Sequence, residues 1–437
     1  MSLGSVVKTI GAGIRLLPGD LGAMLGQAEA NVHDDIDGFI ANLKNWLLEQ
    51  NPEPVFAILR RVDPILIVKG FAVVTRYDDV QEVLSRDDVF HVPYAQKFEQ
   101  LTGGRNFFLG MENTPEYTRD ESTMRLAIRR EDIPQRVMPF VERTAEDIVS
   151  RAGGRIDVVK ELGNIVPSQL VAEYIGTPSP TPSEFADQSA AMSGYLFIPA
   201  GSNPDLERQA IADAKSMLAV LTRQIAERKR DRGKRDDVLE RCLVLQDAGL
   251  PGMSDQDILD KLFGVVVAII PTTSAAFARA LDELLRRPKE LERAQHAARE
   301  NDFATVWQFM SEAMRFNPLG PGVFRVAASD YTVAAGTSRA KTIPQGSIVL
   351  AAIASAMFDS NNIDDPSDFR IDRPAYTYMH FGYGLHTCFG QYINVAQLPR
   401  MAAALLRRTN LRRAPGPAGQ LAVNGAFPTS MTLEYDP

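Results

Sequence analysis

Cys388 is the residue of this chain whose surroundings best fit a chemical role. It lies in the run Phe381-Gly-Tyr-Gly-Leu-His-Thr-Cys-Phe-Gly390, where glycines flank the thiol on both sides. Gly382 and Gly384 permit a tight turn with positive φ, and Gly390 lets a flat ligand approach the backbone. The segment that follows has a helical pattern, and a helix N-terminus stabilises a negatively charged sulfur. Together these features favour a thiolate ligand to haem iron over the common role of cysteine as a small buried apolar side chain.

The run resembles the signature of the cytochrome P-450 haem-thiolate family, Phe-x-x-Gly-x-His/Arg-x-Cys-x-Gly. In that family the cysteine sulfur is the axial iron ligand and favours cleavage of the O–O bond. The resemblance therefore implies haem b (iron protoporphyrin IX) as the cofactor and Cys388 as the metal ligand, with Arg325 and His386 as candidates for the haem propionates. The predicted cofactor-binding residues are Cys388, His386, Arg325, Phe381, Gly382, Gly390 and Ala268.

A second match lies upstream, in the pair Glu312 and Arg315. They are three residues apart on a predicted helix over 303–316, so they share one face. Taken alone, such a pair is as often an ordinary surface ion pair. By resemblance it is the Glu-x-x-Arg pair that supports the haem-binding core, which a later arginine joins. Arg370 and Arg373 are both candidates for that arginine.

The apolar helical segment 258–285 is expected to cross the haem face opposite the thiolate. Family monooxygenases carry Ala/Gly-Gly-x-Asp/Glu-Thr-Thr there, whereas this chain reads Ala268-Ile-Ile-Pro-Thr-Thr273. Thr272 and Thr273 remain as the predicted catalytic residues, but Pro271 holds the acid position and cannot relay a proton. A proline inside a helix removes a hydrogen bond and costs about 3 kcal/mol, so we expect an opened or kinked turn.

Another departure falls in the run Asn113-Thr-Pro-Glu-Tyr-Thr-Arg-Asp-Glu121, where relatives commonly have Pro-Pro-Glu-His-x-x-x-Arg. Tyr117 and Glu121 hold the positions of the histidine and arginine that contact a haem propionate. A carboxylate there would repel the propionate, so Glu121 is expected to point elsewhere. Arg119 and Arg125 are both open as substitutes.

Three functions are open at this level. The first is a cytochrome P-450 monooxygenase that hydroxylates an apolar small molecule (lipid, terpenoid or steroid) with O2 and electrons from ferredoxin and ferredoxin reductase; family frequency ranks it first. The second is an O2-independent fatty-acid hydroperoxide isomerase, dehydratase or peroxygenase. It is favoured by Pro271, by Glu121, and by Asn394 and Gln397, which resemble a pattern in P-450-like partners of haem dioxygenases. The third is a non-catalytic haem-binding or sensor protein.

Apolar and aromatic side chains predict a greasy ligand. The stretches 90–112 and 192–204 are expected to be long and irregular and, as in the family, to cover the substrate pocket. Each aromatic residue in them could equally fill the core. Arg105 is expected to be solvated rather than to anchor a carboxylate. The predicted pocket residues are Phe107, Phe108, Leu196, Phe197, Ile269, Pro271, Val323, Phe324 and Phe427.

The periodicities predict a mainly α fold with small β-sheets, in which the haem lies between the long distal helix and the proximal cysteine loop and helix. Helices are expected over 136–152, 206–229, 254–285 and 303–316, with strands in 70–76 and 342–352. By resemblance, residues 1–437 form a single haem-binding domain with an N-terminal extension over 1–30.

Composition sets the remaining limits. The net charge of −8 argues against nucleic-acid binding. Two cysteines give no disulfide framework, which is typical of the cytoplasm. We find no apolar stretch near 18 residues and therefore expect no transmembrane anchor.

Overall fold

The structure is a computed structural model that describes residues 53–68, 70–197, 203–425 and 427–436. The expected N-terminal extension lies outside these residues. The chain divides into two compact units, each assembled from several segments. Of the described residues, unit 1 contains 53–68, 70–91, 320–368 and 375–385, and unit 2 contains 92–197, 203–319, 369–374, 386–425 and 427–436. In the described part helices predominate and the sheets are small, as predicted.

Unit 1 is built on a five-stranded sheet with the order β1-β2-β8-β5-β3. β2 and β8 are parallel, and the other neighbours are antiparallel. Runs of β-branched and aromatic residues form its central strands, and all four residues of β2 are buried. Its elements are α4 (Glu53–Val62), β1 (Ile65–Val68), β2 (Phe71–Val74), α5 (Tyr77–Ser85), β3 (Phe90–His91), β5 (Val323–Ala327), β6 (Tyr331–Val333), β7 (Lys341–Ile343), β8 (Ile348–Ala351), α16 (Ile353–Ala356) and η5 (Ala375–Thr377).

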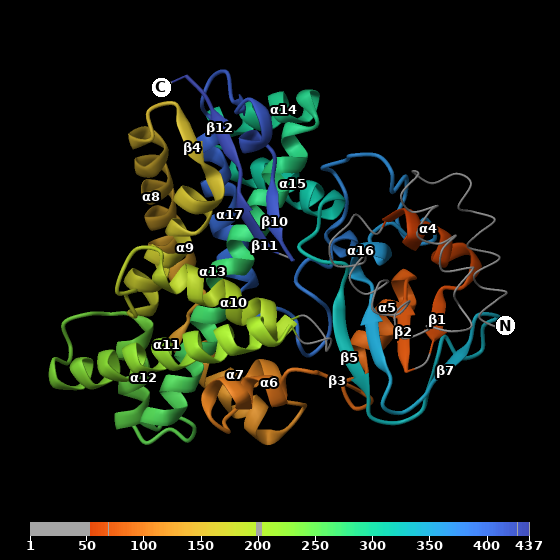
Figure 1. Ribbon diagram of the computed structural model, residues 1–437, viewed down its shortest axis with the longest axis horizontal. Coiled ribbons are helices and arrows are strands. Elements are labelled where there is room, and N and C mark those ends of the chain that lie inside the picture. Colours follow the sequence, from red (N-terminus) through yellow and green to blue (C-terminus); the bar gives the residue numbers. More distant parts are fainter. Residues whose placement is uncertain (1–52, 69, 198–202, 426, 437) are drawn as a thin grey trace. The chain divides into compact units, whose positions relative to one another are not determined.

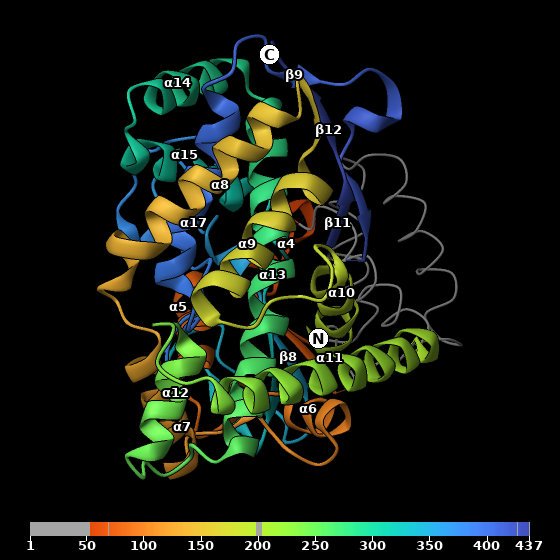
Figure 2. The same ribbon diagram turned by 90° about the vertical axis from the view of Figure 1, so that its left-hand side faces the viewer.

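Unit 2 is mainly helical and is organised around α13 (Asp255–Leu285), which Figure 2 shows in contact with α10 and α17. Its other elements, shown in Figure 1, are α6 (Ala95–Thr102), η1 (Phe108–Gly110), α7 (Pro115–Ala127), η2 (Ile133–Val137), α8 (Met138–Arg151), β4 (Arg155–Asp157), η3 (Val158–Gly163), α9 (Ile165–Leu170), η4 (Val171–Ile175), α10 (Glu184–Phe197), α11 (Pro204–Arg230), α12 (Val238–Asp247), α14 (Pro288–Arg299), α15 (Phe303–Phe316), α17 (Gln391–Leu406), β9 (Arg412–Arg413), η6 (Gly416–Gly419), β10 (Ala422–Asn424), β11 (Phe427–Ser430) and β12 (Thr432–Glu434).

Helix α13 begins at a capping box. The Ser254 hydroxyl accepts from the Asp257 N–H, and the Asp257 carboxylate accepts from the Ser254 N–H. The helix contains an 18-residue window long and apolar enough to cross a membrane, which our expectation of no such stretch missed; 78% of that window is buried within the protein. Its hydrophobicity is therefore that of a core helix.

The predicted helices agree with α8, α11, α13 and α15 to within a few residues, and the predicted strands contain β2 and β8 and overlap β7. The prediction that the stretches 90–112 and 192–204 are irregular was partly wrong. The first contains α6, and the described part of the second, up to residue 197, belongs to α10. Helix α10 contacts both α11 and α13, so tertiary packing overrides the low helix propensity of its serines and glycine.

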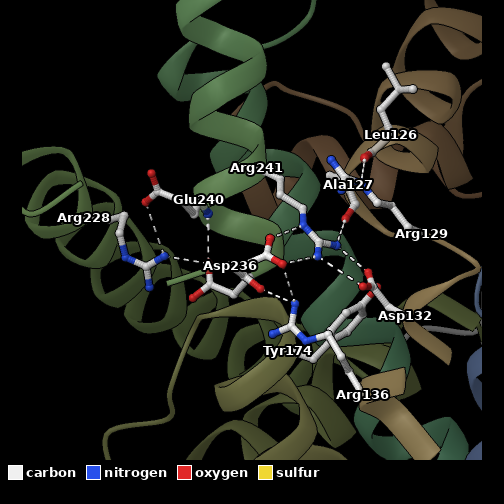
Figure 3. Close-up of polar contacts among 11 residues, drawn as sticks. Leu126, Ala127, Arg129, Asp132, Arg136, Tyr174, Arg228, Asp236, Glu240 and Arg241 are labelled. Carbon is white, nitrogen blue, oxygen red and sulfur yellow. Dashed lines mark hydrogen bonds and ion pairs between the residues drawn. The ribbon is translucent and has the colours of Figure 1, made fainter. Parts of the chain in front are cut away.

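An ion network centred on the buried pair Arg241 and Asp132 connects α12 with the segment before η2 and with η4, which follows α9 (Figure 3). The Arg241 guanidinium donates to both carboxylate oxygens of Asp132, and to Asp236 at 2.7 and 2.9 Å. The Tyr174 hydroxyl donates to Asp132 at 2.9 Å. Burial alone raises the pKa of Asp132, but the hydrogen bonds from Arg241 and Tyr174 and the charge of Arg241 bring it below its ordinary value.

Asp132→Asn is expected to lower the free energy of unfolding by about 2 kcal/mol at pH 7, because hydrogen bonds from a charged partner are lost. A lowered pKa stabilises the fold above the ordinary carboxyl pKa and ceases to do so as pH falls through the folded value. The difference between variant and parent in urea unfolding should therefore shrink below about pH 4.

The matched control is Asp147→Asn, which removes an exposed pair with Arg151 at 3.7 Å and should cost less than about 1 kcal/mol. Equal losses from the two variants, or a difference that persists in acid, would contradict this account of Asp132.

Candidate active site

The proximal segment leads directly into a helix, as predicted. α17 starts at Gln391, whose N–H donates to the Cys388 carbonyl at 3.2 Å, and Gly390 is its N-cap. Cys388 is half-buried. Burial is the largest influence and raises the pKa of its thiol above the ordinary value, and the Gly390 N–H and the positive charge of Arg125 offset part of that rise. A partly accessible thiol next to a helix N-terminus and a guanidinium has the donor chemistry that a thiolate iron ligand requires.

The glycine turn before the cysteine has the predicted backbone. Gly382 and Gly384 have φ of 77° and 74°. A Cβ at Gly384 would lie 2.3 Å from the carbonyl oxygen of Leu84, so only glycine fits there. Gly390 has a negative φ, and a Cβ there would meet the Cys388 sulfur at an ordinary 3.9 Å.

Arg125 is the arginine that reaches the cysteine loop. Its Nη1 donates to the Phe389 carbonyl at 3.0 Å, and its guanidinium lies 3.9 Å from the centroid of the Phe389 ring. Its Nε donates to Glu121 at 2.7 Å, which turns that carboxylate toward an arginine, in line with the expected reorientation. Arg119 instead pairs with Asp120 at 2.8 Å. Of the two open substitutes, Arg125 is therefore the one beside Cys388.

Tyr117, which holds the family's histidine position, is buried next to His386. The two rings meet edge to face, with centroids 5.3 Å apart. The aromatic residue in the altered position thus supports the imidazole that precedes the cysteine by two residues.

Helix α13 runs unbroken through Pro271, so the expected opening of the helix is not seen. Pro271 has no N–H to donate to the carbonyl of Val267. That carbonyl accepts a hydrogen bond from the Ser193 hydroxyl at 2.9 Å instead. Ala268 and Thr272 lie one turn apart on a half-buried face of this largely buried helix. The Thr272 hydroxyl donates to the Ala268 carbonyl at 2.5 Å.

Thr273 connects α13 to α17. Its hydroxyl donates to Asn394 Oδ1 at 2.9 Å and accepts from Gln397 Nε2 at 3.1 Å. Gln397 Nε2 also donates to Asn394 Oδ1 at 2.8 Å. Gln397 and Thr273 are buried. This closed network holds the helix that follows the cysteine against the helix that carries Thr272.

Two predicted pocket aromatics make a second connection between α13 and the cysteine loop. The Phe107 ring packs on Gly264, where a Cβ would lie 2.5 Å from ring carbons. The ring centroids of Phe108 and Phe389 are 5.2 Å apart, and those of Phe107 and Phe108 are 4.0 Å apart. Both are buried and connect α13 with the cysteine loop, and their place in the substrate pocket stays a prediction.

The predicted pair Glu312 and Arg315 is present and fully buried, with Arg315 Nη2 donating to Glu312 at 2.7 Å. Arg373 Nε donates to the same carboxylate at 3.0 Å, so Arg373 is the arginine that joins the pair. Arg370 contributes its backbone N–H at 2.9 Å, while its side chain pairs with Asp372.

The remaining predicted residues are divided between the units. Arg325, Phe381, Gly382, Val323 and Phe324 belong to unit 1; Leu196, Phe197, Ile269 and Phe427 belong to unit 2. Arg325 is buried in β5, and its Nη1 donates to the Phe324 carbonyl at 2.8 Å.

Arg105 is partly solvated, with 32% of its side chain exposed, and its Nε donates to both carboxylate oxygens of Asp260 at 3.0 and 2.9 Å. Asp260 lies on α13. The charge of this arginine is thereby matched within the protein, which removes it as an anchor for a substrate carboxylate.

The sequence interpretation missed Ser193 and the partners of Thr273. The proline at position 271 predicts that the carbonyl of residue 267 needs a hydrogen-bond donor from outside the helix. The sequence does not indicate which helix supplies that donor. Asn394 and Gln397 were noted as polar groups near the haem, yet their contact with Thr273 depends on how two helices pack.

Comparison with known proteins agrees with this geometry. The cytochrome P450 family model matches residues 190–420, more than half of the chain. Cytochrome P450 107B1 of Saccharopolyspora erythraea is 26% identical over 283 residues, which are 64% of each chain. The vitamin D(3) 25-hydroxylase of Pseudonocardia autotrophica is 26% identical, with 80% of this chain and 83% of the relative covered. The crystal structure of CalO2 matches 88% of this chain and 96% of its own, with 23% identity and a TM-score of 0.74.

The chain belongs to the cytochrome P450 family, and its fold is the cytochrome P450 fold. It is an oxidoreductase of the monooxygenase class with a haem-thiolate centre. The match to the family signature makes Cys388 the residue to which the thiolate role is assigned.

Proposed function

We propose that this cytochrome P450 hydroxylates an apolar small molecule, such as a lipid, terpenoid or steroid, with O2 and electrons from a ferredoxin-type partner. The observation that carries the proposal is the connection between the two helices of unit 2. Thr273, Asn394 and Gln397 hold the helix that follows Cys388 against the helix that carries Thr272. A thiolate and a hydroxyl-bearing turn are thus kept in one rigid arrangement.

Haem b is the proposed cofactor and would supply the redox chemistry that inserts one oxygen atom into a C–H bond. Cys388 would bind the iron, with Gly390 and Ala268 against the macrocycle. His386 would hold a propionate, because an imidazole N–H donates to a carboxylate. In this proposal the chain acts as one haem-centred domain in the cytoplasm, where its two free cysteines stay reduced.

The proposed pocket is apolar. Leu196, Phe197, Ile269 and Phe427 of unit 2 supply its aliphatic and aromatic surface. The Phe197 ring meets Tyr94 edge to face at 5.4 Å. Because Asp260 engages Arg105, binding is expected to depend on burial of apolar surface rather than on an ion pair.

Electrons are proposed to enter next to the cysteine loop. Arg129 and Arg130 are exposed there, and Arg130 donates to the Tyr392 hydroxyl at 2.7 Å. Leu126, Tyr392 and Val395 expose apolar surface. Apolar residues flanked by arginines suit an acidic electron-donor protein.

The hydroperoxide-using enzyme stays as a second candidate because Pro271 holds the position of the relay acid. Thr272 also has its hydroxyl engaged with the Ala268 carbonyl. In the oxygenase reading this hydroxyl must still hold one water for proton delivery, with its own proton donated to the helix. A hydroperoxide substrate brings its O–O bond preformed, so this delivery of protons by Thr272 would be unnecessary.

Thr272→Ala separates the two readings. Oxygen-driven turnover should yield about 10²-fold less product per electron, the lower end of what a positioned proton-transfer group contributes. Turnover driven by cumene hydroperoxide in the same protein should change little. Product and NADPH consumption are measured with whichever probe is turned over, among dodecanoic acid, a sesquiterpene and a steroid.

The control for that experiment is Thr222→Ala in α11, whose hydroxyl makes the same kind of bond to a carbonyl four residues back, Leu218, at 2.8 Å. It should leave both activities unchanged. Undiminished oxygen-driven turnover in the Thr272 variant would remove this residue from proton delivery.

The first test of the proposal is an ultraviolet-visible spectrum of the purified protein reduced by dithionite, with and without carbon monoxide. An unreduced sample then receives a fatty-acid hydroperoxide. A thiolate-type carbon monoxide band without hydroperoxide consumption supports the monooxygenase. Rapid hydroperoxide loss without reductant supports the second candidate, and a thiolate band with no turnover of any oxidant and probe supports a binding or sensor protein.

A further inference from the structure

The Val267 carbonyl of α13 lacks its usual hydrogen-bond donor within the helix because of the sequence. In an α-helix the N–H of each residue donates to the carbonyl four residues earlier. Pro271 has no N–H, so it cannot serve Val267. Val267 is 1% exposed, which keeps water from taking the place of the missing donor, and an unpaired buried carbonyl destabilises a fold.

Ser193 of α10 supplies the donor. Its hydroxyl lies 2.9 Å from the Val267 oxygen, and its side chain is fully buried. A serine inside a helix usually donates to a carbonyl of its own helix. Here the hydroxyl crosses to the neighbouring helix and meets the one carbonyl that Pro271 deprives of its donor.

This bond lies between two functional groups of the proposed enzyme. On α10, Leu196 and Phe197 follow Ser193 by three and four residues and so share its side of the helix. On α13, the next carbonyl, that of Ala268, accepts the Thr272 hydroxyl. We infer that Ser193 is a positioning residue, whose hydrogen bond to Val267 fixes the Pro271 turn and thereby sets where Thr272 stands. The first half of this inference depends only on the fold, whereas the second rests on the proposed function.

A double-mutant cycle tests the first half. The variants are Ser193→Ala, Pro271→Ala and both together, and hydrogen–deuterium exchange is followed in peptides that cover residues 260–275. Ser193→Ala alone should speed exchange of the slow α13 amides about tenfold. With Pro271→Ala present, the new N–H at position 271 can donate to Val267, so the serine change should then alter exchange less than twofold.

Ser189→Ala is the matched control. Ser189 lies one turn earlier on α10 and is equally buried, but among the described residues its hydroxyl has no hydrogen-bond partner. This change removes a buried hydroxyl of the same helix without removing a bond, so exchange in α13 should stay within twofold of the parent. An equal effect of Ser193→Ala with and without Pro271, or an effect no larger than that of Ser189→Ala, would overturn the assignment.

Imidazole, which binds ferric haem iron from the distal side, tests the positioning role by optical titration of the Soret band. Ser193→Ala should change its Kd at least threefold, and the double variant should restore the Kd of Pro271→Ala to within twofold. A cycle seen in exchange without any change in the Kd would overturn the positioning claim. A protein that takes up no haem would fail the proposed function instead, and the exchange cycle would remain readable.

Discussion

Cys388→Ser abolishes the thiolate-type carbon monoxide band of the reduced protein and lowers monooxygenase turnover by at least about 10³-fold. A serine hydroxyl stays protonated where a thiol can ionise, so it cannot supply the electron-rich axial ligand that favours O–O cleavage. Burial raises the pKa of the Cys388 thiol above its ordinary value, and the Gly390 N–H and the charge of Arg125 offset part of that rise. The measurement is the carbon monoxide difference spectrum, with haem content determined on the same sample.

Cys242→Ser is the natural control, because it makes the same change at the other cysteine. Cys242 is fully buried in α12, and burial raises the pKa of its thiol to about 12. This variant should lose some stability, because a hydroxyl replaces a buried thiol, but its carbon monoxide band should keep the parental position. A thiolate-type band in the Cys388 variant, or its loss in the Cys242 variant, would contradict the ligand assignment.

The residues on the cysteine side of the site could be predicted from the sequence, whereas much less of the side formed by α13 could. Gly382, Gly384 and Cys388 form a local pattern, so their turn and the helix that follows could be predicted from types and spacing. The pair of Glu312 and Arg315 was equally local, because it depends only on two residues three positions apart on one helix. Arg373 could only be offered beside Arg370, since the choice between them depends on how a distant segment folds back.

The distal side could not be predicted because its bonds cross between helices. Pro271 predicted an open turn in α13. The turn is not open, and the Ser193 hydroxyl of α10 donates to the Val267 carbonyl that the proline leaves without a donor. The stretch that contains Ser193 was itself expected to be irregular, since serine and glycine weaken a helix. Contacts with α11 and α13 reverse that preference. Local propensity therefore erred where tertiary bonds decide the structure.

Glu312→Gln should have the largest effect on stability. Glu312 and Arg315 are completely buried and Arg373 is 3% exposed at its side chain. Loss of the carboxylate charge leaves two guanidinium groups facing a neutral amide, which should cost about 3–5 kcal/mol in the free energy of unfolding. Burial raises the pKa of Glu312, but Arg315, the Arg370 N–H and Arg373 bring it below its ordinary value. The stabilisation is therefore complete at neutral pH and is lost as the pH falls through the lowered pKa.

The surface offers a pair of the same spacing for comparison. Glu290 and Arg293 are also three residues apart on one helix, at 2.7 Å, but the arginine side chain is 57% exposed. Glu290→Gln should cost less than about 1 kcal/mol, because water screens and replaces the lost contact. Urea unfolding of both variants at pH 7, followed by circular dichroism and by haem absorbance, measures the contrast. Similar small losses would mean that the buried carboxylate is dispensable, whereas a large loss confined to Glu312→Gln would tie the stability of the haem-bearing unit to this single charge.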